Sequence, residues 1–166
     1  MQIRKIDQSE ARAYFECLKS IDQETKFMMF EPDERQFNEE LIVNYLSDES
    51  DLFLGVFNEH EIVGFLAAKR GSFRRIRHSA YIVIGIRHAF QGQGIGLKLF
   101  DKLDEWARKN QLKRLELTVE VSNTPAINLY EKQGFSIEGI KSKTMLVDGE
   151  FVDEYMMAKL YIYDLL

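Results

Sequence analysis

The stretch Gln91-Gly92-Gln93-Gly94-Ile95-Gly96 lies between an apolar run, Ile82–Ile86, and a segment of helical periodicity that begins near Gly94. A loop that opens a helix leaves unpaired backbone N–H groups at the positive end of the helix dipole. Glycines let the backbone approach a phosphate closely and adopt positive φ. The stretch therefore predicts a site for an anionic group such as a pyrophosphate. A glycine-rich turn that only reverses the chain is the alternative interpretation.

Two other phosphate-binding loops fit this stretch poorly. The dinucleotide fingerprint requires a third glycine where Leu97 stands. Its acidic residue, expected about 20 residues further on, would be Glu116, which falls inside the next predicted strand. The P-loop requires Gly-Lys-Ser/Thr, which the stretch lacks. A nucleotide-binding module is therefore the weakest of the functions that the loop suggests.

The segments next to the loop predict a strand–helix–strand unit. Gly96–Lys109 has helical periodicity, and Leu112–Val121 alternates apolar and polar residues as a strand does. The apolar side of the predicted helix consists of Leu97, Phe100, Leu103, Trp106 and Ala107. Because a helix connects them, we expect the strands Ala80–Ile86 and Leu112–Val121 to lie parallel in one sheet.

The rest of the chain alternates between helical and strand patterns. Further strands are expected at Gln2–Ile6, Leu52–Phe57, Ile62–Ala68, Phe135–Met145 and Phe151–Leu160. Further helices are expected at Ala11–Ile21, Phe37–Leu46 and Thr124–Gln133. Asp148-Gly149 predicts a hairpin between the last two strands, and Glu24–Pro32 predicts an ordered loop with exposed apolar residues. No repeat or linker divides the pattern, so we expect a single domain over residues 1–166.

Composition narrows the class of protein. The 166 residues carry a formal net charge of −5, which disfavours nucleic acid and membrane surfaces as partners and suits a cationic amine. The first residues mix charged and apolar types, and no later run approaches the roughly 20 apolar residues of a membrane helix. We therefore expect a cytoplasmic protein. The single cysteine, Cys17, cannot form an internal disulfide, and with three scattered histidines we expect no metal site.

A second motif follows the predicted strand Leu112–Val121. Together with the glycine-rich loop, it resembles the GNAT acetyltransferase superfamily. The pattern Gln91-x-x-Gly94-x-Gly96 matches the acetyl-CoA loop of that family. The pattern Asn123-x-x-Ala126-x-x-Leu129-Tyr130-x-x-x-Gly134-Phe135 matches the segment after its fifth strand. The resemblance runs from about Ile62 to the end of the sequence.

The resemblance implies an α+β fold with α/β/α layers. Its mixed, mostly antiparallel sheet would be flanked by about four helices, and its central parallel strands, Ala80–Ile86 and Leu112–Val121, would splay apart to admit the pantetheine arm of acetyl-CoA. Backbone groups near Ile84 and Ile86 would pair with that arm, and a backbone N–H near Ile86 would polarise the thioester carbonyl. The phosphates would lie on the N–H groups of Gln91, Gly92, Gln93, Gly94, Ile95 and Gly96.

Two residues of the second motif have implied roles at the reacting end of the cofactor. Asn123 would bond the pantetheine region, and Tyr130 would lie near the sulfur. Acetyl transfer to an amine needs a proton for the departing thiolate, and a tyrosine of ordinary pKa about 10 can supply it to a thiolate of pKa about 8.5. Tyr130 is therefore the candidate general acid. From spacing alone, it can equally be an aromatic residue packed on the buried face of a short helix.

Two glutamates are candidates for the general base. Glu116, Thr118 and Glu120 share one face of a strand, and a carboxylate there can deprotonate the amine directly or through water. Some N-terminal protein acetyltransferases carry a glutamate five positions before Asn123, where this sequence has Thr118. Glu116 and Glu120 are thus both candidates, and solvated strand charges are the alternative interpretation.

The resemblance also indicates where an acceptor would bind. The family binds acceptors with its first two helices and its final hairpin, which correspond to Phe27–Glu34 and Met145–Tyr155. These acidic and apolar segments suit a primary amine, either a small molecule, a polyamine or a peptide N-terminus. The tail resembles the branch of ribosomal-protein N-terminal and spermidine acetyltransferases. The same apolar residues can instead form a homodimer interface.

Two functions of different classes follow from the sequence. The first is an acetyl-CoA-dependent N-acetyltransferase that works by direct attack in a ternary complex. The second is a non-catalytic acyl-CoA-binding regulatory domain, which the absence of an obvious base suggests. The presence of both Tyr130 and Asn123 favours the enzyme.

Overall fold

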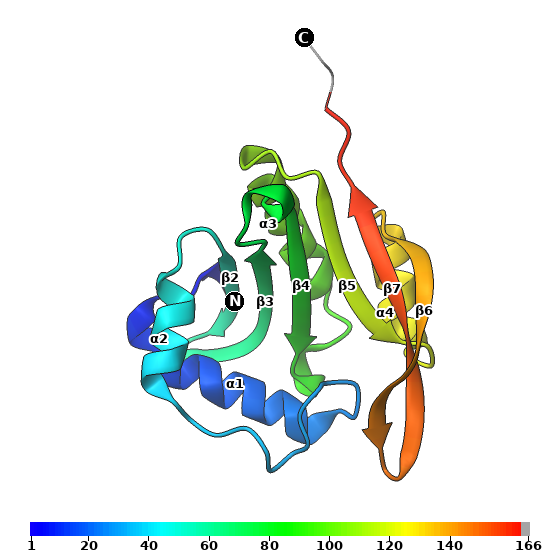
Figure 1. Cartoon of the computed structure of the whole chain (residues 1–166). Helices are drawn as coiled ribbons and strands as arrows, with labels where there is room; N and C mark the ends of the chain where they lie inside the picture. Colours follow the sequence, from blue (N-terminus) through cyan, green and yellow to red (C-terminus); the bar gives the residue numbers. More distant parts are fainter. Residues whose placement is uncertain (164–166) are drawn as a thin grey trace.

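The computed structural model describes residues 1–163 and contains a seven-stranded sheet flanked by four α-helices (Figure 1). The helices are α1 (Ala11–Glu24), α2 (Glu39–Ser47), α3 (Ile95–Lys109) and α4 (Thr124–Lys132). The strands are β1 (Gln2–Lys5), β2 (Leu52–Asn58), β3 (Glu61–Arg70), β4 (Ser79–Ile86), β5 (Arg114–Glu120), β6 (Ser136–Val147) and β7 (Glu150–Leu160). The short 3-10 turns are η1 (Gln8–Glu10), η2 (Arg74–Ile76) and η3 (His88–Phe90). The last three residues of the predicted domain 1–166 lie outside the described residues.

The sheet divides where its two parallel strands meet. Its order is β1-β2-β3-β4-β5-β7-β6, and every neighbouring pair is antiparallel except β4 and β5. β4 pairs with β3 over seven register positions, but with β5 over only three, which end at Tyr81 and Glu116. Beyond Tyr81 the two strands diverge (Figure 1). The predicted mixed sheet with splayed central strands is confirmed.

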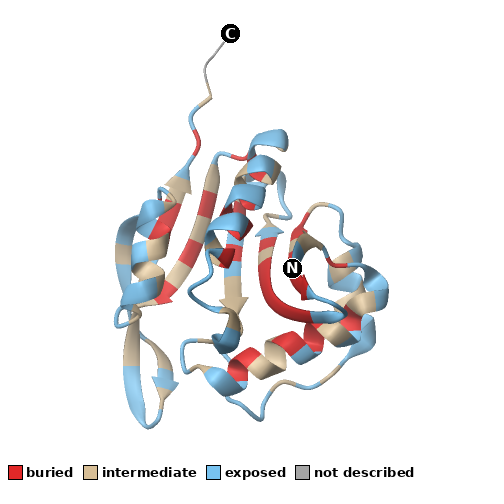
Figure 2. Ribbon diagram, turned by 180° about the vertical axis from the view of Figure 1, so that it is seen from behind, coloured by how far each residue is buried: buried red, intermediate tan, exposed pale blue. Residues whose placement is uncertain are grey.

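Hydrophobic cores lie on both faces of the sheet (Figure 2). Phe65 and Leu66 are neighbours on β3 and therefore point to opposite faces, and they belong to different cores. Tyr14 of α1 joins the core of Phe65, whereas Leu103 of α3 and Tyr130 of α4 join that of Leu66. The predicted α/β/α layers are thereby confirmed. No helix within residues 1–163 has both the length and the hydropathy needed to cross a membrane.

Two details of the sequence prediction are wrong. Periodicity predicts Leu97 on the apolar side of α3, but its side chain is 46% exposed, because this first turn of the helix borders a cleft and not the sheet. The pattern also predicts Phe37 as part of the second helix, but it precedes the N-cap Asn38. There its ring packs edge-on against Phe15, with 5.2 Å between centroids. In both cases a local apolar pattern does not reveal the surface that the residue meets.

The segment between α1 and α2 is held in place by charged contacts. Asp22 is 1% exposed and accepts hydrogen bonds from Arg35 at 2.6 Å to Nε and 3.2 Å to Nη2. The guanidinium of Arg35 also lies over the ring of Phe30, 4.1 Å from its centroid. Further along, Lys26 forms an ion pair with Asp148 at the tip of the β6–β7 hairpin. These contacts order a loop whose aromatic side chains stay partly exposed, as predicted.

We predict that Asp22→Ala lowers the free energy of unfolding by about 3 kcal/mol, because loss of one partner leaves the largely buried Arg35 guanidinium uncompensated. Urea denaturation measures the change. The control is Glu16→Ala, which removes an exposed ion pair with Arg12 and is expected to leave the stability nearly unchanged. Equal losses in the two variants would contradict the anchoring role of Asp22.

Candidate active site

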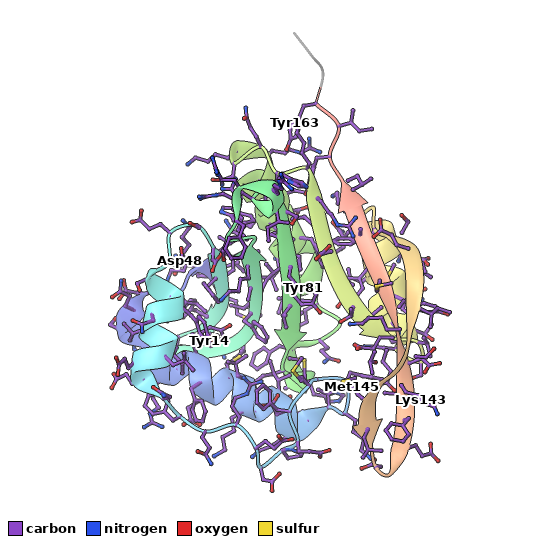
Figure 3. The ribbon with its side chains drawn as sticks, viewed as in Figure 1. Tyr14, Asp48, Tyr81, Lys143, Met145 and Tyr163 are labelled. Atoms are coloured by element: carbon purple, nitrogen blue, oxygen red, sulfur yellow. The ribbon has the colours of Figure 1, made fainter. Side chains whose placement is uncertain are left out.

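A cleft of about 1520 Å³ runs through the gap between β4 and β5. One end is lined by the glycine-rich loop before α3, and the other by α1, α2 and the β6–β7 hairpin. In Figure 3, Tyr14, Tyr81 and Met145 surround the part of the cleft that lies on the α1 side of the sheet. The cleft therefore connects the predicted cofactor loop with the predicted acceptor segments.

The glycine-rich loop forms an open cradle of backbone donors. The N–H groups of residues 92–96 donate no hydrogen bond within residues 1–163. The first backbone hydrogen bond at the start of α3 runs from Lys98 N–H to Gly94 O, at 3.3 Å. Gly92 and Gly94 have φ of 75° and 77°, which a residue with a side chain rarely adopts. Gly96 meets another constraint, since a Cβ there would lie 3.2 Å from Leu129 of α4. Free donors at a helix N-terminus are suited to an anion.

Gln91 differs from the other predicted loop residues. Its N–H donates to His88 O at 3.2 Å, so it is not free for a phosphate. Its side-chain Nε2 donates to Ile86 O at 3.0 Å. Gln91 therefore links the loop to the end of β4 at the border of the gap, whereas Gln93 and Ile95 lie within the open cradle.

The backbone of β4 directs polar groups into the gap. The N–H of Arg87 points to β3 and donates a hydrogen bond to a backbone oxygen there, at 2.9 Å. The carbonyl of His78 points to the β5 side and accepts a backbone hydrogen bond there, at 2.8 Å. Because backbone groups alternate along a regular strand, Ile84 and Ile86 direct theirs toward β5. No β5 residue pairs with them, since the β4–β5 ladder ends at Tyr81. The two predicted isoleucines thus border the gap with their backbone, in the arrangement that an added strand requires.

Tyr130 combines a buried ring with a hydroxyl that faces the cleft. The residue is 8% exposed, and its ring packs against Phe100 and Phe135 with 6.0 Å between centroids in each case. Its hydroxyl has no hydrogen-bond partner in the described part of the chain and belongs to the cleft lining. Burial, and then the nearby Tyr81, raise the pKa of Tyr130 to about 12. The phenol is therefore protonated at neutral pH. Tyr130 can thus be both an aromatic residue packed in the core and the candidate general acid.

A hydroxyl pair stands where β4 and β5 part. Tyr81 and Thr118 share a hydrogen bond of 2.7 Å between Oη and Oγ1, and both line the cleft. From the sequence, Thr118 was predicted only as the residue that replaces a glutamate, and Tyr81 was not predicted as a site residue. The signal that could have identified Tyr81 is a tyrosine within a strand that is otherwise aliphatic.

The two candidate bases have different surroundings. Glu116 accepts from Arg114 Nε at 2.7 Å, is 42% exposed in its side chain, and does not belong to the cleft lining. Glu120 lines the cleft and accepts only from the hydroxyl of Ser122, at 3.1 Å, within the described residues. Its register partner on β7, Glu154, lines the cleft as well. Glu154 is a further carboxylate that strand spacing did not reveal.

Asn123 is placed at the junction of β5 and α4. Its side-chain oxygen accepts the N–H of Ala126 at 3.4 Å and so caps α4, while the residue also lines the cleft. The cap uses the oxygen of the amide, and the nitrogen is left as a donor. Asn123 is therefore in reach of a ligand that lies between the two strands.

The two predicted acceptor segments meet at the far end of the cleft. A smaller cavity of about 440 Å³ lies between Met28 and Glu31 on one side and Met145 and Asp148 on the other. Beside this cavity the β6–β7 pairing is irregular between Lys141 and Met145, and Lys143 has a φ of 53°. Within residues 1–163, no group of three or more His, Cys, Asp or Glu side chains is arranged to hold a metal ion.

Comparison with known proteins places this geometry in a family. A family model described as the Acetyltransferase (GNAT) family matches residues 15–135. The L-amino acid N-acetyltransferase AaaT of Escherichia coli (strain K12) is 37% identical over 103 residues, which are 60% of this chain and 62% of that protein. The chain thus matches less than two thirds of the length of this curated relative.

Solved structures agree in fold. The acetyltransferase of GNAT family from Streptococcus pneumoniae aligns with a TM-score of 0.91 and 29% identity, over 96% of this chain and 99% of that one. The yncA protein of Salmonella typhimurium, solved with its cofactor acetyl-CoA, aligns with a TM-score of 0.85 and 19% identity, over 100% and 96%. At that identity the second likeness shows the fold alone. Because the family model covers most of the chain, the resemblance seen in the sequence is confirmed, and the chain belongs to the acetyltransferase (GNAT) family.

Proposed function

We propose that this protein is an acetyl-CoA-dependent N-acetyltransferase that acetylates a primary amine by direct attack in a ternary complex. The observation that carries the proposal is the cleft through the β4–β5 gap, because it joins the anion cradle before α3 to the hydroxyl of Tyr130. A nucleotide thioester needs both a site for its phosphates and a proton donor for its sulfur. The name of the Escherichia coli relative, an L-amino acid N-acetyltransferase, supports an amine as acceptor.

Acetyl-CoA, which the reaction consumes as its first substrate, supplies the acetyl thioester. The N–H groups of residues 92–96 would hold its pyrophosphate. The backbone groups that Ile84 and Ile86 direct into the gap would pair with its pantetheine arm as with an added strand, and the amide of Asn123 would bond the same arm. Most of these groups lack a partner within the described chain. The exceptions are the carbonyl of Ile86, which accepts from Gln91, and the side-chain oxygen of Asn123, which caps α4.

The chain's own residues would assist the transfer at three atoms. The amine nitrogen bonds to the acetyl carbon while the carbon–sulfur bond breaks. A backbone N–H near Ile86 would donate to the thioester oxygen, on which negative charge develops. Tyr130 would give its proton to the departing sulfur, and Glu120 would take the proton that the amine loses, directly or through water. Glu120 is favoured over Glu116 because Arg114 holds Glu116 outside the cleft.

The test of this function is release of free thiol from acetyl-CoA in the presence of pooled acceptors: polyamines, amino acids, aminoglycosides and peptides. We expect release with at least one pool, and mass spectrometry of the product should show an added acetyl group on nitrogen. Binding of acetyl-CoA by calorimetry without release from any pool would favour the alternative, a non-catalytic acyl-CoA-binding regulatory domain. A cytoplasmic location and a homodimer stay predictions.

Tyr130→Phe should lower kcat by about 100-fold or more while KM for acetyl-CoA stays nearly unchanged, because the phenol acts on the sulfur only as the bond breaks. The ring still fills the core between Phe100 and Phe135. Tyr163→Phe is the matched control. The hydroxyl of Tyr163 donates to Leu112 O at 2.8 Å, and the residue does not line the cleft. Wild-type kcat in Tyr130→Phe would remove the general acid from this mechanism.

The pH profile provides an independent check on Tyr130. Because burial raises its pKa to about 12, the phenol keeps its proton well into the alkaline range. We predict that kcat rises as the acceptor amine loses its proton and does not decline between about pH 8 and 10. A decline in that range that disappears in Tyr130→Phe would show that the phenol ionises there, against this assignment.

A further inference from the structure

The acceptor side of the cleft has one wall with a single charged side chain. We call the cleft residues of α2 and strands β2 to β4 the α2 wall. Its acceptor-side members are mainly apolar or aromatic and include Leu41, Ile42, Tyr45, Phe53, Ala67 and Val83. Among the described residues of this wall, Lys69 is the only charged one. The carboxylates that line the cleft, including Glu120 and Glu154, come from other elements.

Lys69 has no anionic partner in the described chain. Its ammonium lies over the ring of Tyr45, 4.5 Å from the centroid, and forms no ion pair with any residue within 1–163. Asp51 is near enough for Lys69 to lower its pKa, against the larger effect of burial, which raises it. The Asp51 carboxylate, however, is buried and accepts the N–H of Arg70 at 2.8 Å. Lys69 is exposed, and its ammonium is therefore available to a ligand in the cleft.

A second donor, the hydroxyl of Tyr14, belongs to a residue that lines the same cleft. Tyr14 is 7% exposed, and its ring packs against Phe53 and Phe65 at 6.2 and 5.7 Å between centroids. Its hydroxyl lines the cleft and has no hydrogen-bond partner among the residues that the structure describes. No buried side-chain oxygen of the described residues lacks a hydrogen-bond partner, so this hydroxyl retains access to the cleft, where it can donate to a ligand atom.

Lys69 also lies beside the point where the gap between β4 and β5 opens. It is the register partner of Tyr81 across β3 and β4, and paired residues point to the same face. Tyr81 in turn contacts Thr118 at the point where β4 and β5 part, and it affects the pKa of Tyr130. Lys69 is thus one strand, or about 5 Å, away from Tyr81, where the gap between β4 and β5 begins.

We propose that the acceptor is an amine that carries a carboxylate next to its amino group and an apolar side chain, and that Lys69 binds this carboxylate. The inference rests on the proposed acetyltransferase function. A carboxylate offers only acceptor atoms, which matches the two unpartnered donors, Lys69 and Tyr14. The aromatic and aliphatic residues of the α2 wall would contact the side chain. A polyamine would instead place a second cation close to Lys69, which is unfavourable.

The experiment compares amino acids with their amides, which keep the shape of the acceptor and remove the negative charge. Acceptors are L-phenylalanine, L-methionine and L-leucine, each with its carboxamide, and kcat/KM is corrected for the fraction of neutral amine. For the wild-type protein we expect at least one acid to exceed its amide by about 30-fold, as one charge-assisted hydrogen bond would give. In Lys69→Met the ratio should fall to near 1, and Lys69→Arg should retain most of it.

Lys141→Met is the matched control, because Lys141 also lines the cleft but faces Glu154 in the β6–β7 register. It should leave the ratio of acid to amide unchanged. A collapse of the ratio in Lys141→Met but not in Lys69→Met would overturn the assignment. So would a wild-type ratio near 1 with ready turnover of the amides or of polyamines, although the acetyltransferase function would then stand. If acetyl-CoA neither binds nor is consumed with any acceptor, the proposed function itself fails.

Discussion

The pairing of β4 with β5 ends at Tyr81, and the rest of the site depends on this ending. Each strand stays in the sheet because its other edge is fully paired, β4 with β3 and β5 with β7. The inner edges therefore part without loss of the sheet, and the backbone groups of Ile84 and Ile86 are left without a strand partner. Buried backbone groups of this kind normally find a partner. In the structure the side chain of Gln91 supplies one, for the carbonyl of Ile86.

The gap also brings together groups from opposite faces of the sheet. Tyr130 extends from the core beneath α3 and α4, whereas Tyr81, Thr118 and Lys69 lie on the face covered by α1 and α2. A thioester held in the gap would thus have its proton donor on one side and its acceptor on the other. Such an arrangement keeps the amine and the departing sulfur apart while both contact the same acetyl carbon, as direct attack requires.

The fold was predictable because local patterns and the family resemblance agreed. Glycines at 92 and 94 have the positive φ that their residue type suggests, and the Asp148-Gly149 hairpin lies where turn chemistry indicates. The sequence also identified Tyr130 and Asn123 by motif. It could not separate Glu116 from Glu120, because alternation places both on one face and only the contact with Arg114 distinguishes them. Lys69 and Tyr14 were not predicted as site residues, because only tertiary packing decides which side chains have no ion-pair or hydrogen-bond partner.

The most direct test of the central claim is amide hydrogen exchange at single-residue resolution, with and without coenzyme A. If the β4–β5 gap holds the cofactor, the amides of Ile84 and Ile86 and those of residues 92–96 should exchange more slowly in the complex, while amides at the β3–β4 edge, such as that of Val83, change little. Protection that is confined to the loop, with Ile84 and Ile86 unchanged, would show that the gap is not the cofactor site and would contradict the mechanism built on it.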